Sequence, residues 1–183
     1  MKKYKMIILM GEAGSGKDRI LNEILSRNPD KINPLVSYTT RPKREGEIEG
    51  VNYHYISEAD FLNKVRQDLM LETSYFNTWW YGLGKDVLTQ NKINIGVFNP
   101  EGVRSLMSQD DIEIKVFRIS CKDKTRLLRQ LNRENDPNVQ EILRRFNADF
   151  KDFAILDFEY VKLVNETPED LEACIQAVMA EID

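Results

Sequence analysis

The feature that most constrains the fold is an apolar run followed at once by a glycine-rich loop. Residues 6–10 read MIILM, and residues 11–18 read GEAGSGKD. The loop matches the phosphate-binding pattern G-x-x-x-x-G-K-[ST] except at its last position, where Asp18 replaces Ser or Thr. This pattern requires a strand before it and a helix after it, because loop N–H groups and the helix N-terminus together surround a phosphate. The segment therefore predicts a strand–loop–helix unit.

Strand-like and helix-like segments alternate along most of the chain. Apolar runs predict buried strands at 5–9, 93–99, 113–120 and 160–165. Apolar periodicity and capping signals predict helices at 18–26, 57–67, 100–107, 122–134, 139–153 and 167–182. This alternation is typical of an α/β fold in which helices cover a mainly parallel sheet.

Residues 34–90 break this rhythm and are a candidate substrate-binding insert. They follow a turn-rich break at 28–34 and are strand-rich, aromatic and irregular. Strands are predicted there at 34–40, 51–56, 69–77 and 78–82, and a short helix near 83–90.

Composition narrows the classes of protein. With 183 residues, 42% of them hydrophobic and 31% charged, the chain is long enough for one domain with a buried core. Its net charge of −4 gives no overall attraction for nucleic acid or anionic lipid. No apolar stretch approaches the roughly 20 residues of a membrane span, and residues 6–10 are too short for a secretory signal. Cys121 and Cys174 lack metal-binding spacing, so we expect both to be free thiols. Together these features predict a cytoplasmic protein whose partners are small molecules.

The glycine loop predicts a donor-phosphate site. Its backbone would surround the phosphates, and Lys17 would place a positive charge on them. The predicted loop residues are Gly11, Glu12, Ala13, Gly14, Ser15, Gly16, Lys17 and Asp18. A carboxylate is a good oxygen ligand for Mg²⁺, so Asp18 predicts a stricter magnesium requirement. A chance glycine turn and a site that has lost its activity are the alternatives.

A second group of charged residues lies in the segment SYTTRPKREGEIEGVNYHY. Arg41, Lys43 and Arg44 follow a predicted strand, and Tyr53 lies on another. Because planar guanidinium groups bind phosphate through two hydrogen bonds, the arginines suit an acceptor phosphate. A solvated basic turn is the alternative interpretation. Combined with the donor loop, the segment predicts a phosphoryl-transfer site.

This segment resembles the guanylate kinase family, whose pattern is S-x-x-T-R-x-x-R-x-G-E followed by G and Y. The matching residues are Ser37, Thr40, Arg41, Arg44, Gly46, Glu47, Gly50 and Tyr53. The resemblance extends from about Lys5 to Ile182 and implies a P-loop three-layer α/β/α fold in a single domain, residues 1–183. It implies a core at 1–33 and 91–183, a monophosphate-binding insert at about 34–90 and a short helical lid at about 126–145.

The resemblance also implies residue roles. The acceptor phosphate would be held by Ser37, Arg41, Arg44, Tyr53 and Tyr81 with Gly82, and Glu72 would accept hydrogen bonds from guanine N1 and N2. The arginines that close over the donor phosphates would be Arg129, Arg133 and Arg144, with Arg145 as the adjacent alternate. Asn165 would lie at the adenine side, and the cosubstrate would be ATP with Mg²⁺ at Asp18.

Departures from the family pattern leave the base preference open. Leu83 replaces a Ser or Thr beside guanine O6, and Val97 and Asn99 replace two carboxylates, although Asn99 can still accept one base N–H. Some nucleoside monophosphate kinases read G-K-D-T in the loop, which is close to the G-K-D-R of this chain. The resemblance implies transfer of the ATP γ-phosphate to GMP or dGMP. A kinase for another monophosphate and a catalytically silent binding module are the alternatives, and the oligomeric state stays open.

Overall fold

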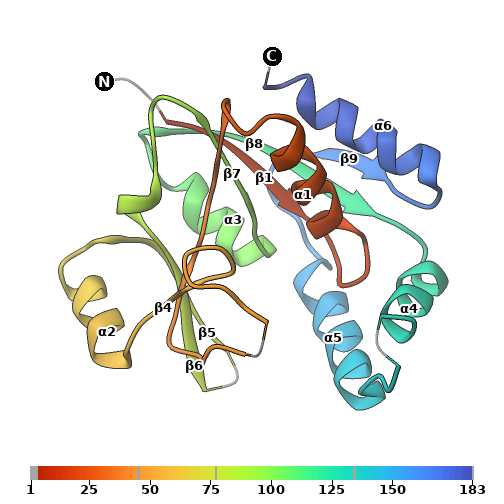
Figure 1. Ribbon diagram of the computed structural model, residues 1–183, viewed down its shortest axis with the longest axis horizontal. Helices are drawn as coiled ribbons and strands as arrows, with labels where there is room; N and C mark the ends of the chain where they lie inside the picture. The colour runs from red at the N-terminus through yellow and green to blue at the C-terminus, as the bar shows by residue number, and fades with distance from the viewer. Residues whose placement is uncertain (1–3, 45, 77, 134, 183) are drawn as a thin grey trace.

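A five-stranded parallel sheet forms the centre of the computed structural model, which describes residues 4–44, 46–76, 78–133 and 135–182 (Figure 1). The strand order is β2–β7–β1–β8–β9. The strands are β1 (Tyr4–Met10), β2 (Ile32–Pro34), β7 (Ile93–Val97), β8 (Ile112–Ser120) and β9 (Val161–Val164). Residues 6–10 of β1 are all buried, as expected for a central parallel strand that helices cover on both faces.

Helices cover both faces of this sheet and confirm the predicted α/β class. On one face, α1 (Lys17–Arg27) packs beside α6 (Pro168–Met179), where Ile20, Ile24 and Ile175 join the sheet in one core cluster. On the other face, Val103 and Leu106 of α3 (Pro100–Met107) join a second cluster. The parallel connections place the loop after β1 at the carboxyl edge of the sheet, where α/β proteins bind ligands.

A second, four-stranded sheet lies at the lower left of Figure 1, with the order β4–β3–β6–β5. Its elements are β3 (Tyr38–Thr39), β4 (His54–Tyr55), α2 (Glu58–Arg66), β5 (Met70–Phe76) and β6 (Trp79–Gly84), followed by the 3₁₀ helix η1 (Lys85–Val87). Its strands fall within residues 34–90, and the exact division of the chain into core, insert and lid stays a prediction.

Two further helices, α4 (Asp123–Leu131) and α5 (Val139–Asp152), pack against each other at the lower right of Figure 1. Helix α4 ends earlier than predicted, so Arg133 lies in the connection between the two helices. Residue 134, at the predicted end of that helix, lies outside the described residues. Among the residues that are described, no helix is long and apolar enough to cross a bilayer.

Two predictions about the start of the insert were wrong. The supposed turn at 28–34 contains β2, which pairs with β7 at the edge of the main sheet. Pro34 is tolerated there because an edge strand leaves one side without a ladder partner. The single strand predicted at 34–40 is divided between two sheets, since Tyr38 pairs with His54 and Gly82 in the second sheet.

Candidate active site

The glycine loop between β1 and α1 has the backbone shape of an anion site. Gly14 and Gly16 have φ angles of 83° and 94°, a left-handed conformation that side chains with a Cβ rarely adopt. At Gly11 a Cβ would collide with the Ile119 carbonyl oxygen. Helix α1 begins directly after Gly16, so its N-terminal N–H groups and its dipole face the loop.

Lys17 and Asp18 differ in how they meet solvent. The Lys17 side chain is 17% exposed, whereas the Asp18 side chain is 76% exposed. Their charged groups lie 3.7 Å apart. A carboxylate in the first turn of a helix interacts favourably with the helix dipole, so Asp18 is compatible with the local structure. The exposed oxygens of Asp18 leave it available to a hard cation at the mouth of the loop.

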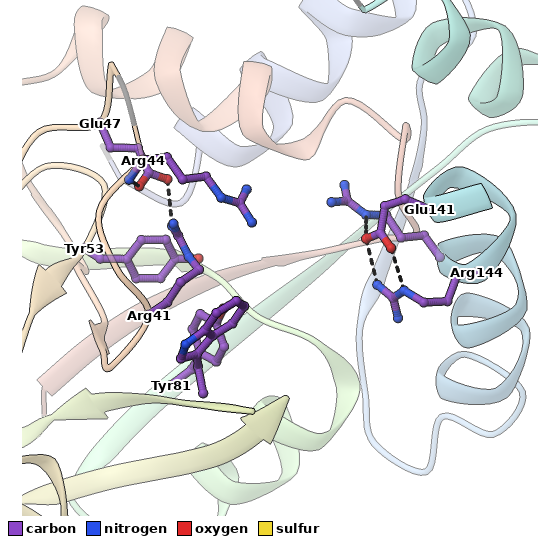
Figure 2. A pocket seen from close by; sticks show the side chains of 9 residues that line it. Arg41, Arg44, Glu47, Tyr53, Tyr81, Glu141 and Arg144 are labelled. Atoms are coloured by element: carbon purple, nitrogen blue, oxygen red, sulfur yellow. Dashed lines mark hydrogen bonds and ion pairs between the residues drawn. The ribbon is translucent and has the colours of Figure 1, made fainter. Parts of the chain in front are cut away.

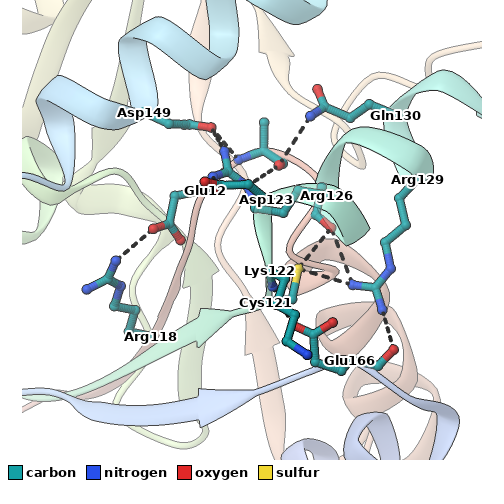
Figure 3. A network of polar contacts seen from close by, with 12 residues as sticks. Glu12, Arg118, Cys121, Lys122, Asp123, Arg126, Arg129, Gln130, Asp149 and Glu166 are labelled. Atoms are coloured by element: carbon teal, nitrogen blue, oxygen red, sulfur yellow. Dashed lines mark hydrogen bonds and ion pairs between the residues drawn. The ribbon is translucent and has the colours of Figure 1, made fainter.

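Arg129 and Asn165 both donate hydrogen bonds to carbonyl oxygens of the glycine loop. The buried Asn165 donates from Nδ2 to the Ser15 carbonyl oxygen at 2.8 Å. Arg129 donates to the carbonyl oxygens of Gly14 and Ser15, both at 3.4 Å, and its position beside the loop is visible in Figure 3. Both residues were predicted as nucleotide ligands, and in this structure both contact the backbone that would surround the donor phosphates.

Four of the predicted acceptor residues, Arg41, Arg44, Tyr53 and Tyr81, line a cavity of about 430 Å³, shown in Figure 2. This volume suits a small ligand. The lining residues are Arg41, Arg44, Glu47, Tyr53, Trp79, Tyr81, Glu141, Arg144 and Arg145. Residues between 41 and 81, in the predicted insert, and residues between 141 and 145, in the predicted lid, therefore meet at one cavity.

Arg41 is the most enclosed charge of this cavity. Its side chain is 5% exposed and donates to Glu47 at 2.7 Å, and its guanidinium carbon lies 5.5 Å from the centre of the Tyr53 ring. Glu47 also accepts from the Arg44 backbone N–H at 2.7 Å. The hydrogen bond that Glu47 accepts from Arg41 is the largest of the effects that lower its pKa to about 2. The Arg41 guanidinium, which could bind a phosphate, is therefore paired with the Glu47 carboxylate in this structure.

The Tyr53 ring lies edge-on to that of Tyr81, with the ring centres 5.8 Å apart. Burial raises the pKa of Tyr53, and the neighbouring Tyr81 adds to the effect. The positive charge of Arg41 opposes the rise.

On the α5 side of the cavity, a carboxylate again pairs with the arginines. Glu141 accepts two hydrogen bonds from Arg144, at 2.7 and 2.9 Å, and one from Arg145 at 2.9 Å. These bonds, with Arg144 first, lower the pKa of Glu141 to about 2. In Figure 2, Glu141 and Arg144 face the arginine–tyrosine group across the open space. Arg133 lines a smaller neighbouring cavity with Glu141 and Arg145.

Four predicted substrate-binding residues do not line the main cavity. Ser37 is half-buried just before β3, and its carbonyl oxygen accepts from the His54 N–H. At Gly82 an added Cβ would lie 2.7 Å from the Glu72 carbonyl oxygen, so strand packing requires glycine there. The Asn99 side-chain oxygen accepts from the Gly102 N–H at 2.8 Å and caps α3, so that oxygen is already engaged.

Glu72, the fourth, has the pKa most relevant to base recognition. The pairing of β5 with β6 shifts by one residue between Met70 and Glu72, and such a bulge redirects the side chains beside it. Burial raises the pKa of Glu72 to about 7, while the Leu83 N–H opposes the rise and Glu101 adds to it. The Leu83 side chain is fully buried in the core cluster around α3. Glu72 is thus a largely desolvated carboxyl that accepts a hydrogen bond from the Leu83 N–H.

Glu72→Gln is expected to stabilise the protein at pH 8 more than at pH 4. A carboxyl whose pKa rises from 4.5 to about 7 on folding favours the native state below pH 4.5 and loses that contribution as the pH rises through 7. The difference amounts to up to about 3 kcal/mol at pH 8. Urea unfolding of wild type and variant at both pH values measures it. Glu58→Gln, on the exposed start of α2, is the control, and an identical effect of Glu72→Gln at both pH values would contradict the prediction.

Sequence reasoning missed a polar network beside the loop, shown in Figure 3. Arg126 donates to the Ala13 carbonyl oxygen and to Asp149, and Arg118 donates to Glu12 at 2.7 Å. A signal was present for Asp149, which interrupts the apolar side of α5 between Phe146 and Phe153. A charge on such a face predicts a buried partner.

The parallel sheet, its glycine loop and the facing arginine cavity together define the class of P-loop kinases that act on small phosphorylated acceptors. The comparisons with known proteins are more specific. Residues 3–182 match the guanylate kinase family, so the chain belongs to that family.

Its relatives include the guanylate kinase of Synechococcus sp. (strain JA-3-3Ab), 29% identical over 96% of this chain and 81% of that protein. The guanylate kinase of Chlamydia trachomatis serovar D is 30% identical over 88% of this chain and 80% of that protein. The crystal structure of guanylate kinase from Anaplasma phagocytophilum has the same fold, with a TM-score of 0.68 at 17% identity, and the match covers 100% of this chain and 88% of that one.

Proposed function

We propose that this chain transfers the γ-phosphate of ATP to the phosphate of GMP or dGMP, giving ADP and the nucleoside diphosphate. The observation that carries the proposal is the cavity in which Arg41 and Arg44 of the insert face Arg144 and Arg145 of α5. Four arginines around one small cavity suit a phosphorylated ligand better than any neutral one. Membership of the guanylate kinase family supports the same reaction.

Positioning and charge neutralisation supply the catalysis. No general base is required, because the acceptor phosphate is already an anion. Arg41 and Arg44 hold that phosphate and, with Tyr53 and Tyr81, fix its direction of attack. Lys17 neutralises charge on the donor β- and γ-phosphates.

The carboxylates of Glu47 and Glu141 give the arginines partners in the structure described here. Binding of phosphate exchanges these carboxylates for phosphate oxygens, which are acceptors of the same kind. Arg144, joined by Arg133, then stabilises the transferring group as the lid closes and excludes water. Breaking the ion pairs of these arginines with Glu47 and Glu141 costs free energy. Only a ligand of comparable negative charge offsets that loss.

Base recognition rests on Glu72. An ionised carboxylate accepts two hydrogen bonds, and guanine offers N1–H and N2–H side by side on one edge. Because Glu72 has a pKa of about 7, guanine binding favours loss of its proton and should strengthen as the pH rises through that value. Leu83 offers no hydroxyl for guanine O6, and the Asn99 oxygen caps a helix. Because Leu83 and Asn99 offer guanine fewer hydrogen bonds, other nucleoside monophosphates should also be tested as acceptors.

The residues at the donor site fit a bound Mg²⁺. Asp18 supplies an exposed carboxylate, the ligand type that Mg²⁺ prefers, and the described residues hold no group of three or more metal-binding side chains. Most ligands would then come from phosphate and water, as is usual for this ion in kinases. Bound there, Mg²⁺ would neutralise charge on the donor phosphates.

Asp18→Ala is expected to raise the magnesium concentration for half-maximal activity several-fold, because one protein oxygen ligand is lost. Magnesium titrations of wild type and variant at saturating nucleotides measure this. Asp30→Ala, beyond the far end of α1, controls for the loss of a negative charge. An unchanged titration would remove Asp18 as a ligand.

Cytoplasmic residence and binding of nucleotides without nucleic acid or membrane partners belong to the same proposal. Cys121 and Cys174 are free thiols, which suits a reducing compartment. The net charge of −4 gives no overall attraction for nucleic acid or anionic lipid.

The test is a coupled ADP-release assay with Mg-ATP and a panel of ribo- and deoxynucleoside monophosphates. Turnover with GMP or dGMP at least tenfold above all other acceptors supports the proposal. A preference for another monophosphate would keep the reaction and correct the acceptor. No turnover with any acceptor, despite nucleotide binding, would favour a silent binding module.

A further inference from the structure

The peptide units around Ala13, in the middle of the glycine loop, are held from both sides by the lid helices. The Ala13 N–H donates to Asp149 Oδ2 of α5 at 2.9 Å. The Ala13 carbonyl oxygen accepts from Arg126 Nε of α4 at 3.0 Å and from Gln130 Nε2 at 3.3 Å. A loop backbone that must present N–H groups to phosphate is thus fixed by side chains from another part of the chain (Figure 3).

Arg126 is built into this contact. The residue is 3% exposed, and its guanidinium donates to Asp149 and, at 2.8 Å, to Asp123. It also lies 4.3 Å from the centre of the Phe146 ring. Its backbone packs so closely on Gly14 that a Cβ there would lie 2.7 Å from the Arg126 carbonyl oxygen. Such a buried charge is costly unless fully paired, so its position is tightly determined.

We propose that Asp149 and Arg126 are positioning residues for the donor phosphates. They hold Ala13 so that the N–H groups of the following residues point into the loop. They also fix the loop to α4 and α5, which flank the connection that carries Arg133 and provide Arg144. This inference rests on the proposed function, because it assumes that the loop binds the ATP phosphates.

The test measures ADP binding by calorimetry, together with the KM values for ATP and GMP. In Asp149→Ala the affinity for ADP is expected to fall roughly 10- to 100-fold, the size of effect expected when one hydrogen bond to a charged group is lost. The KM for ATP should rise in parallel, while the KM for GMP stays within about twofold. Asp149→Asn keeps an acceptor for the Ala13 N–H and should recover part of the loss. Asp152→Ala, exposed on the same helix, is the matched control.

Because Asp149→Ala leaves the buried Arg126 with the Asp123 carboxylate but without that of Asp149, this variant loses stability as well. The double variant Arg126→Met/Asp149→Leu removes both charges, and replacement of a buried pair by apolar side chains is commonly tolerated. We expect it to fold with a melting temperature near that of wild type and still to bind ADP weakly. Wild-type ADP affinity in the folded double variant would overturn the positioning role, as would equal losses for ATP and GMP in Asp149→Ala. Failure of the proposed function shows differently, as wild-type protein that turns over no monophosphate.

Discussion

Lys17→Ala is expected to lower kcat roughly 10²- to 10³-fold, the usual cost of removing one preorganised charge from a transition state. Lys17 extends from the first residue of α1 with only 17% of its side chain exposed, so its charge is held within the donor loop. The affinity for the acceptor should change little, because the acceptor cavity is lined by other residues. Steady-state kinetics with Mg-ATP and GMP, with circular dichroism to verify folding, measure the effect.

Lys162→Ala removes an equivalent charge from the exposed edge strand β9 and is the matched control. It should leave kcat and both KM values unchanged. If Lys17→Ala kept the kcat of wild type while folded, the donor site would have to lie away from the glycine loop.

Arg41→Ala is expected to raise the KM for GMP by about 100-fold or more, with a much smaller change for ATP. The guanidinium is nearly buried beside the Tyr53 ring, so its removal would take away a positive charge and two parallel hydrogen bonds to phosphate in a poorly solvated place. Substrate titrations, each at saturating concentration of the other nucleotide, separate the two effects. Arg41→Lys should lie between wild type and Arg41→Ala, because an ammonium keeps the charge and loses the planar geometry.

Loss of Arg41 also leaves the Glu47 carboxylate with fewer partners, so a lower melting temperature is expected in the same variant. Arg66→Ala, at the exposed end of α2 in the same part of the chain, controls for the loss of an insert arginine. A parallel rise in the KM values for ATP and GMP in Arg41→Ala would indicate a general loss of structure and would contradict the acceptor assignment.

Most of the fold could be predicted from the sequence, because its signals are local. The apolar run before the loop, Ser57 and Thr167 as helix caps, and Pro100 and Pro168 in first helical turns each act within a few residues. The strands of the insert were harder to predict. Strand β4 pairs over only two residues, and the segment at 34–40 contributes to two sheets. Such pairing depends on neighbours far away in the chain, which no short pattern records.

The candidate site was predictable in its chemistry and less so in its contacts. Residue type and position identified Arg41, Arg44 and Tyr53, and the family resemblance added Tyr81 and Arg144. The structure brings these five residues together. The roles proposed for them remain to be tested by the variants above. The sequence could not predict which neighbouring side chains pair with these arginines, or how far burial changes the pKa of a carboxyl group. Glu47 and Glu141 bind arginines, and burial, with a smaller contribution from Glu101, raises the pKa of Glu72.

The sequence by itself determined the strand–loop–helix unit, the α/β class and the chemical types gathered for phosphate, because these depend on local backbone conformation and residue chemistry. Only the tertiary structure decided which side chains are desolvated and which backbone groups they hold. Ala13 is hydrogen-bonded to Asp149 and Arg126, which lie 136 and 113 positions further along the chain. Hydrogen bonds and burial depend on distance in space, so contacts of this kind are set when the helices pack against the loop.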